Sequence, residues 1–269
     1  MPGLRLLLSG VLLLCSSLGF GQDQVCKTTP NAQDMAYIGD LIYRNECNRD
    51  PACLVDWNPG EAFPSLGIGH FIWYPTGVEA RFTESFPLFV QYLQQRSVSL
   101  PSWLNQLDPL DAPWASRTQL MQQRDNAQVN SLRHFLATHI AEQSAFMLTR
   151  LQQAIPQLLI QANASDRIQL QANLRALCQT PLGWYALIDY VNFKGEGLNP
   201  RERYNGQGWG LLQVLQTMNH KQPANNAFAN AAAKVLTRRA NLSQSTTEQR
   251  WLQGWLKRVD SYRRQTMLD

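Results

Sequence analysis

The chain has 269 residues, a formal net charge of +4 and 44% hydrophobic residues. The charged fraction of 16% is too low for a disordered chain, and no Lys/Arg block marks it as a nucleic-acid-binding protein. The length allows one large or two modest domains with a sizeable core.

The first residues are typical of a secretory signal peptide. Arg5 precedes the mostly apolar stretch Leu6–Leu18, and the small residues Gly19 and Gly21 follow it. We therefore predict a signal peptide over 1–21 and a periplasmic or secreted protein. A retained membrane anchor is the alternative, but the apolar stretch is short for a spanning helix.

Four cysteines remain after the predicted cleavage. An even number of cysteines in an exported chain predicts disulfides. Cys47 and Cys53 flank a short, turn-rich loop and are the favoured pair, which leaves Cys26 to bond with Cys178.

The first predicted helix places a carboxylate at the end of an apolar face. Ile38 and Ile42 precede Glu46 at four-residue steps. Partial burial and the negative end of the helix dipole would both raise the pKa of Glu46. A carboxyl that stays protonated near neutral pH suits a general acid. Alternatively, Glu46 projects past the helix and pairs with Arg44 or Arg49.

The pattern of the whole chain predicts a mainly α fold, with a helical lobe and a small lobe that holds a β-hairpin. Strands are expected at Leu54–Trp57 and Ser65–Trp73, around a turn at Asn58–Gly60. The predicted helical regions are Asp34–Glu46, Thr83–Arg96, Thr118–Gln161 with a break or kink at Pro156, Ser165–Leu177, Pro181–Asn192, Gly208–Met218, Ala224–Asn241 and a last helix that opens with a capping box at Ser245–Glu248.

Two segments resemble phage-type lysozymes. Ser65–His70 reads Ser-Leu-Gly-Ile-Gly-His, similar to the family signature Thr-Ile-Gly-x-Gly-His, and Glu46 lies where the family has a catalytic Glu. Ala186–Asn192 resembles the central helix of the family. The resemblance implies one lysozyme-like domain over 22–269, with a helical insertion around 83–177.

This resemblance implies cleavage of the β-1,4 bond between N-acetylmuramic acid and N-acetylglucosamine in peptidoglycan glycan strands. Glu46 would protonate the leaving oxygen, and Ser65 would position water or the 6-hydroxyl of muramic acid. The family's second carboxylate is missing, because Pro59 falls at its place. Glu61 and Asp56 are nearby carboxylates that could substitute, although a hairpin Glu is more often a solvated turn residue.

The missing carboxylate leaves three outcomes open. A hydrolase needs a second group to stabilise the transition state or activate water. A lytic transglycosylase needs one carboxyl, because the 6-hydroxyl of muramic acid attacks and gives a 1,6-anhydro product. A non-catalytic peptidoglycan-binding protein needs neither.

A downstream segment offers a rival acid. Glu196 and the Gly-Leu-Leu-Gln sequence that ends at Gln213 resemble goose-type lysozymes and soluble lytic transglycosylases. If Glu46 is the acid, then Glu196, Tyr204, Asn205 and Gln213 are expected to line the opposite wall of a cleft. Gln213 would bind sugar N-acetyl groups or its own helix start. Trp209 would stack on a sugar or pack in the core.

The histidines do not predict a metal site. His70 is expected to be structural, bonding to neighbouring backbone or a carboxylate. His134 and His139 are five residues apart, which does not give a shared helix face. We therefore predict no cofactor.

Overall fold

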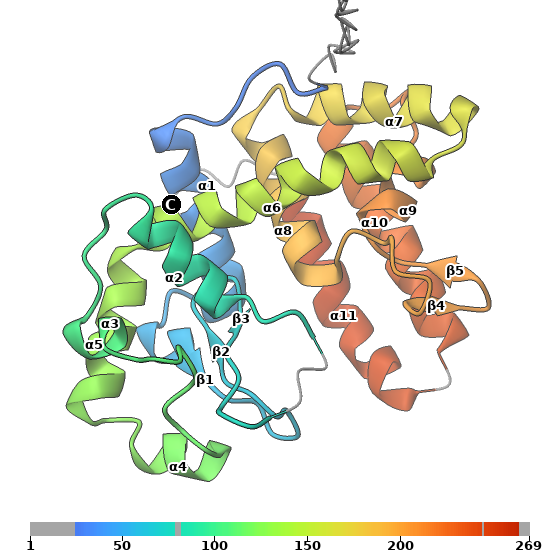
Figure 1. The fold of residues 1–269 in the computed structure, drawn as a ribbon. Coiled ribbons are helices and arrows are strands. Elements are labelled where there is room, and N and C mark those ends of the chain that lie inside the picture. Colours follow the sequence, from blue (N-terminus) through green and yellow to red (C-terminus); the bar gives the residue numbers. More distant parts are fainter. Residues whose placement is uncertain (1–24, 79–81, 244, 264–269) are drawn as a thin grey trace, which may run out of the picture.

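The computed structural model describes residues 25–78, 82–243 and 245–263. It is mainly helical, as predicted (Figure 1). The α-helices are α1 (Ala32–Cys47), α2 (Phe86–Gln94), α3 (Ser102–Asn105), α4 (Arg117–Gln122), α5 (Ala127–Thr138), α6 (Ile140–Gln161), α7 (Ala164–Leu177), α8 (Pro181–Lys194), α9 (Leu211–Thr217), α10 (Ala224–Leu242) and α11 (Thr246–Asp260). The signal peptide predicted over 1–21 lies outside the described residues.

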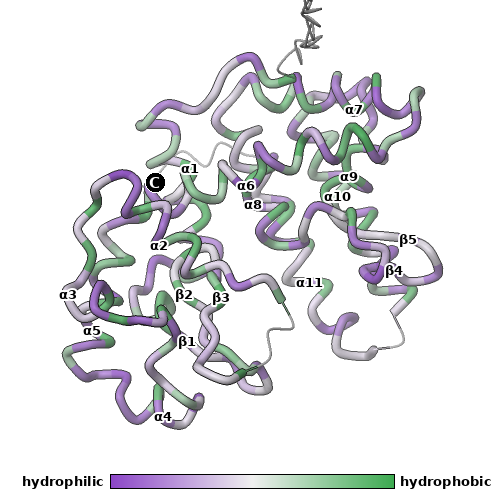
Figure 2. Tube along the Cα trace, viewed as in Figure 1, coloured by the Kyte–Doolittle hydropathy of each residue, from purple (hydrophilic) through white to green (hydrophobic). Residues whose placement is uncertain are grey.

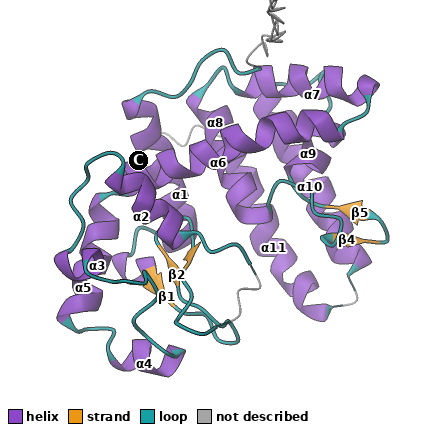
Figure 3. Cartoon of the chain, in the orientation of Figure 1, coloured by secondary structure: helices purple, strands orange, loops and turns teal. Residues whose placement is uncertain are grey.

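The strands gather in two places (Figure 3). The strands β1 (Val55–Asp56), β2 (Ser65–Leu66) and β3 (Phe71–Ile72) form one antiparallel sheet in that order. The strands β4 (Arg203–Tyr204) and β5 (Gln207–Gly208) form a separate antiparallel pair. Two short 3-10 helices complete the elements: η1 (Pro51–Leu54) and η2 (Ser261–Arg263).

The prediction of one long strand over Ser65–Trp73 is wrong. The backbone turns between β2 and β3, with φ of +67° at Gly67 and +47° at His70. A chain that adopts positive φ at two positions leaves the extended conformation, so one predicted strand becomes two. The strand predicted over Leu54–Trp57 is likewise shortened to β1, because its first residue belongs to η1.

Buried Gln143 of α6 holds this turn in place. Its side-chain oxygen accepts a hydrogen bond of 2.9 Å from the backbone N–H of Ile68, and its amide nitrogen donates to the carbonyl of Leu136. A Cβ on Gly67 would lie 2.1 Å from the Gln143 oxygen. The turn therefore requires glycine for space as well as for backbone conformation.

Replacing Gly67 by alanine is expected to destabilise the fold by about 2–4 kcal/mol, because it adds backbone strain and displaces a buried hydrogen-bonding group. Gly60→Ala is the matched control. Gly60 also has a positive φ, of +87°, but an added Cβ would have no neighbour within 4 Å. Urea unfolding should give a loss of only about 1–2 kcal/mol for this control. Equal losses would show that the contact with Gln143 contributes nothing.

The buried side chains form one continuous core that extends from Val25 to Tyr262. Hydrophobic and hydrophilic residues alternate along most helices (Figure 2), as expected for helices that each bury one face. Helix α6 packs on both α1 and α8, so the segment around 83–177 contributes to the centre of the molecule. The helix continues past Pro156 to Gln161, which shows that the expected break does not occur.

The last helix buries an apolar stripe, but it does not begin with the predicted capping box. Trp255 and Val259 are buried, and Tyr262 of η2 continues the stripe, whereas Trp251 is 55% exposed. Ser245 caps α11 through the N–H of Thr247. Glu248 bonds to other side chains, so the predicted box does not form.

Both predicted disulfides are present, Cys47–Cys53 and Cys26–Cys178. The first closes the loop after α1, and the second joins the segment before α1 to the residue after α7. Such bonds are typical of exported proteins. None of the helices in the described ranges is long and apolar enough to cross a bilayer.

Candidate active site around Glu46

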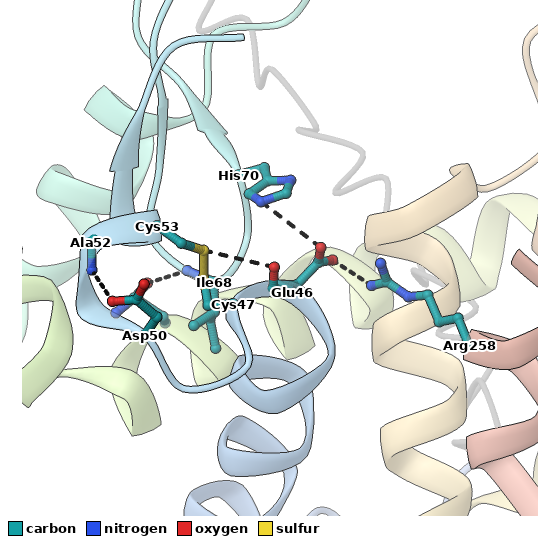
Figure 4. Close-up of a disulfide and its surroundings, with 9 residues drawn as sticks. Glu46, Cys47, Asp50, Ala52, Cys53, Ile68, His70 and Arg258 are labelled. Carbon is teal, nitrogen blue, oxygen red and sulfur yellow. Dashed lines mark hydrogen bonds and ion pairs between the residues drawn. A yellow bond between two sulfur atoms is a disulfide. The ribbon is translucent and has the colours of Figure 1, made fainter. Parts of the chain in front are cut away.

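Glu46 lies in the last turn of α1, between the small sheet and α11 (Figure 4). Its side chain is only 9% exposed. On one side, His70 Nε2 lies 3.8 Å from Glu46 Oε2. On the other side, Arg258 of α11 donates a hydrogen bond to Glu46 Oε1. The structure therefore brings the helix-end carboxylate against the turn that carries the Gly-Ile-Gly-His sequence.

The predicted rise in the pKa of Glu46 is wrong. Burial does act to raise this pKa, but the positive charges of Arg258, His70 and Lys194 and the hydrogen bond from Arg258 outweigh it. The pKa of Glu46 is therefore below its ordinary value, and the carboxylate is ionised at neutral pH. Local sequence could not reveal this, because Arg258 is 212 residues away.

Arg49, which was considered as an ion-pair partner of Glu46, pairs with a different carboxylate. Arg49 Nε donates a hydrogen bond of 2.7 Å to Asp40 Oδ1 on the surface of α1. Asn48, at the end of the helix, has a φ of +49°, in the left-handed region. The cation beside Glu46 is Arg258 of a distant helix.

Arg258 is held by a second, fully buried carboxylate. Asp189 of α8 has no exposed surface and accepts hydrogen bonds of 2.9 Å and 2.7 Å from Nε and Nη2 of Arg258. The Tyr262 hydroxyl donates to the same carboxylate at 2.5 Å. Two hydrogen bonds to Asp189 therefore fix the guanidinium of Arg258, which also donates a hydrogen bond to Glu46.

The ion pair between Asp189 and Arg258 was not predicted, although the sequence contained a signal for a buried charge. Asp189 is the one charged residue in the apolar helical stretch Leu182–Val191. A buried Asp requires a partner. The sequence does not show which cation of the chain this is, and the structure identifies it as Arg258.

The hairpin residues predicted to assist Glu46 have different surroundings. Ser65 is buried in β2, directly opposite Asp56 of β1. Glu61 lies in the exposed turn, where its carboxylate accepts a hydrogen bond of 3.2 Å from the side chain of Asn58. Of the two candidate second carboxylates, Asp56 is therefore the one across from Ser65.

Glu196 and Gln213 have local partners. Arg150 of α6 donates a hydrogen bond of 3.0 Å to Glu196 Oε1. Gln213 accepts from the N–H of Gly210 and donates to the carbonyl of Gly197, at 3.0 Å and 3.1 Å. The structure thus gives Gln213 the second of its two expected roles, the bond to its own helix start.

Tyr204 and Trp209 form a second cluster with Glu248. The two rings lie 4.8 Å apart, and the Tyr204 hydroxyl donates a hydrogen bond of 3.0 Å to Glu248. Trp209 is buried, so packing is its role here. Asn205 is exposed, with a φ of +47° in the turn between β4 and β5. The predicted helix from Gly208 therefore begins later, at Leu211.

Comparison with known proteins gives no family for this chain. No protein-family model, no curated protein and no solved structure matches it. In the part of the chain that the structure describes, no group of three or more His, Cys, Asp or Glu side chains could hold a metal ion. Function must therefore be argued from the Glu46 site itself.

Proposed function

We propose that the chain is an exported enzyme that cleaves the β-1,4 bond between N-acetylmuramic acid and N-acetylglucosamine in peptidoglycan. The observation that carries this proposal is the contact between Glu46 and the Ser65–His70 segment, through His70. The phage-type lysozyme resemblance requires a helix-end Glu next to that segment. The two disulfides fit the predicted export to the periplasm or the cell exterior.

In the proposed reaction, Glu46 donates a proton to the glycosidic oxygen. Because Arg258 and His70 favour the ionised carboxylate, only a small fraction of Glu46 carries that proton at neutral pH. Activity is therefore expected to rise as the pH falls toward the pKa of Glu46. Its low pKa also makes the protonated form a strong acid.

Whether cleavage leaves a reducing end or a 1,6-anhydro end depends on whether a second group assists Glu46 by positioning water. Ser65 and Asp56 lie opposite each other, so a hydrolase would use this pair to position water. The second candidate function is a lytic transglycosylase. It is supported by the exposed position of Glu61 in its turn, where the carboxylate has the side chain of Asn58 as a hydrogen-bond partner. The proposed site then has a single acid/base carboxylate, Glu46.

Replacing Glu46 by glutamine tests the activity. The amide keeps the shape of the side chain but cannot supply the proton, so lysis of purified cell wall should fall by about 100-fold or more. Glu196→Gln is the matched control, because Glu196 is the rival acid. If wall lysis persists in Glu46→Gln and is lost in Glu196→Gln, the rival is correct.

Mass analysis of the muropeptide products separates the remaining alternatives. Reducing ends identify a hydrolase, and 1,6-anhydro ends identify a transglycosylase. A protein that binds the wall and releases no products is a non-catalytic binder. Asp56→Asn is expected to lower the release of reducing ends and to leave anhydro products unchanged.

A further inference from the structure

Cations and aromatic rings alternate next to the Glu46 site. The guanidinium carbon of Arg258 lies 4.1 Å from the centroid of the Phe193 ring, and Lys194 Nζ lies 3.9 Å from the same centroid. Lys194 Nζ also lies 3.7 Å from the ring of Trp255. Cation–π contacts therefore hold the ammonium of Lys194 against two rings. One of these rings, Phe193, also contacts Arg258, the cation that binds Glu46.

The alternation of cations and aromatic rings continues from Trp255 to Arg239 and Trp209. The Arg239 guanidinium lies 5.0 Å from the Trp255 ring and 4.1 Å from Trp209. Arg239 also forms a two-point ion pair with Glu248, at 2.6 Å and 3.1 Å. Three helices and the segment after β5 thus contribute to one row of cations and rings, with α8 supplying Lys194 at its centre.

Lys194 differs from the two arginines that flank it. Arg258 has Glu46 as a partner, and Arg239 has Glu248. Among these three cations, Lys194 alone has no carboxylate within ion-pair distance in the described ranges. Its cation–π contacts with Phe193 and Trp255 do not use the N–H donors of the ammonium, and no carboxylate of the described residues takes them in an ion pair.

The surroundings of Lys194 make its charge costly without an anion. Burial lowers the pKa of Lys194 to about 7, and the positive charges of Arg239 and Arg258 add to this effect. Glu248 and Glu46 oppose it only in part. An incoming carboxylate would supply the missing negative charge and restore the protonated form.

We propose that Lys194 binds a carboxylate carried by the glycan substrate, beside the bond that Glu46 cleaves. The inference rests on the proposed function. Peptidoglycan offers two sources of this group: the lactyl carboxylate of muramic acid, where the peptide has been removed, and the carboxylates of the stem peptide. Chitin oligosaccharides have neither. The contact would therefore select muramic acid polymers over chitin.

The test measures binding by the mature chain in a Glu46→Gln background, so that the glycan stays intact. The ligands are glycan strands stripped of peptide by an amidase, strands that keep their peptides, and chitin oligosaccharides. Lys194→Met should weaken binding of a carboxylate-bearing ligand by about 10- to 100-fold and leave chitin binding unchanged. The strand type that loses affinity identifies the source of the carboxylate.

Two further variants complete the test. Lys194→Arg should restore binding, because it keeps the charge. Lys257→Met removes an exposed lysine from α11 and should change nothing. Unchanged affinity for both strand types in Lys194→Met, or an equal loss for chitin, would overturn the proposal. Unchanged chitin binding also shows that the variant is folded.

The pH dependence of binding affinity is a measurement that a purely structural role of Lys194 would not affect. Affinity for the carboxylate ligand should fall as the pH rises past the pKa of Lys194, which is about 7 with Glu46 in place and lower in the Glu46→Gln background, where one of the charges that raise it is gone. Lys194→Arg should remove this fall, whereas contributions from His70 and Glu248 would persist in both proteins. Cleavage that continues in Glu46→Gln would contradict the proposed function separately, because the binding comparison does not depend on cleavage.

Discussion

Replacing Arg258 by methionine is expected to destabilise the protein by about 3–5 kcal/mol. The change leaves Asp189 and Glu46 as buried carboxylates without their cation, and Asp189 has no exposed surface through which water could compensate. Urea unfolding at pH 7 measures the loss. Asp189→Asn combined with Glu46→Gln in the same chain should recover part of it, because neutral amides do not need the cation.

The matched control is Arg49→Met. Arg49 and Asp40 form an ion pair with a distance as short as 2.5 Å, but both side chains are 42% exposed. Exposed pairs contribute at most about 1 kcal/mol, because water screens them. A loss for Arg258→Met no larger than that for Arg49→Met would contradict the assigned role of Arg258.

The same Arg258 variant should shift the pH dependence of wall lysis. Without the guanidinium, burial remains the main influence on Glu46 and raises its pKa. More of the carboxyl is then protonated at a given pH, so the decline in activity moves to higher pH. Any activity that survives the loss of stability should show this shift.

Removing the Cys26–Cys178 disulfide is expected to cost about 5 kcal/mol, against about 2 kcal/mol for Cys47–Cys53. The sequence separations are 152 and 6 residues, and a longer closed loop restricts the unfolded chain more. Double alanine variants are suitable because they avoid burying a new polar group. Denaturant unfolding of both variants measures the difference.

The short disulfide should matter more for activity than for stability. It ties the residue directly after Glu46 to the start of the small sheet, so its loss should loosen the position of the carboxylate. Wall lysis by the Cys47→Ala/Cys53→Ala variant should fall further than its stability loss explains. Equal stability losses for the two variants would contradict the loop-length argument.

Local sequence patterns were sufficient for the fold class and for much of the framework. Apolar periodicity predicted α1 and α11, and the almost wholly apolar stretch Pro181–Asn192 predicted the buried helix α8. The Cys47–Cys53 pair followed from proximity along the chain. The remaining pair was then determined by the even cysteine count.

The errors concern interactions between distant segments. The sign of the Glu46 pKa shift depends on Arg258, and the strand break at Gly67 is stabilised by Gln143, 75 residues after Ile68. Neither partner is marked by spacing or composition. Asp189 did carry a signal, because a charged residue in an apolar helix indicates a buried partner even when the partner is unknown, although no prediction was drawn from it.

The 212-residue separation between Glu46 and Arg258 has a consequence for how the protein is made. Contacts between distant segments form late in folding, because the entropy of closing the loop must be overcome first. A growing chain that has reached α10 carries Glu46 and Asp189 but lacks the cation that both require. The site is therefore assembled only when α11 docks and brings Arg258 to both carboxylates.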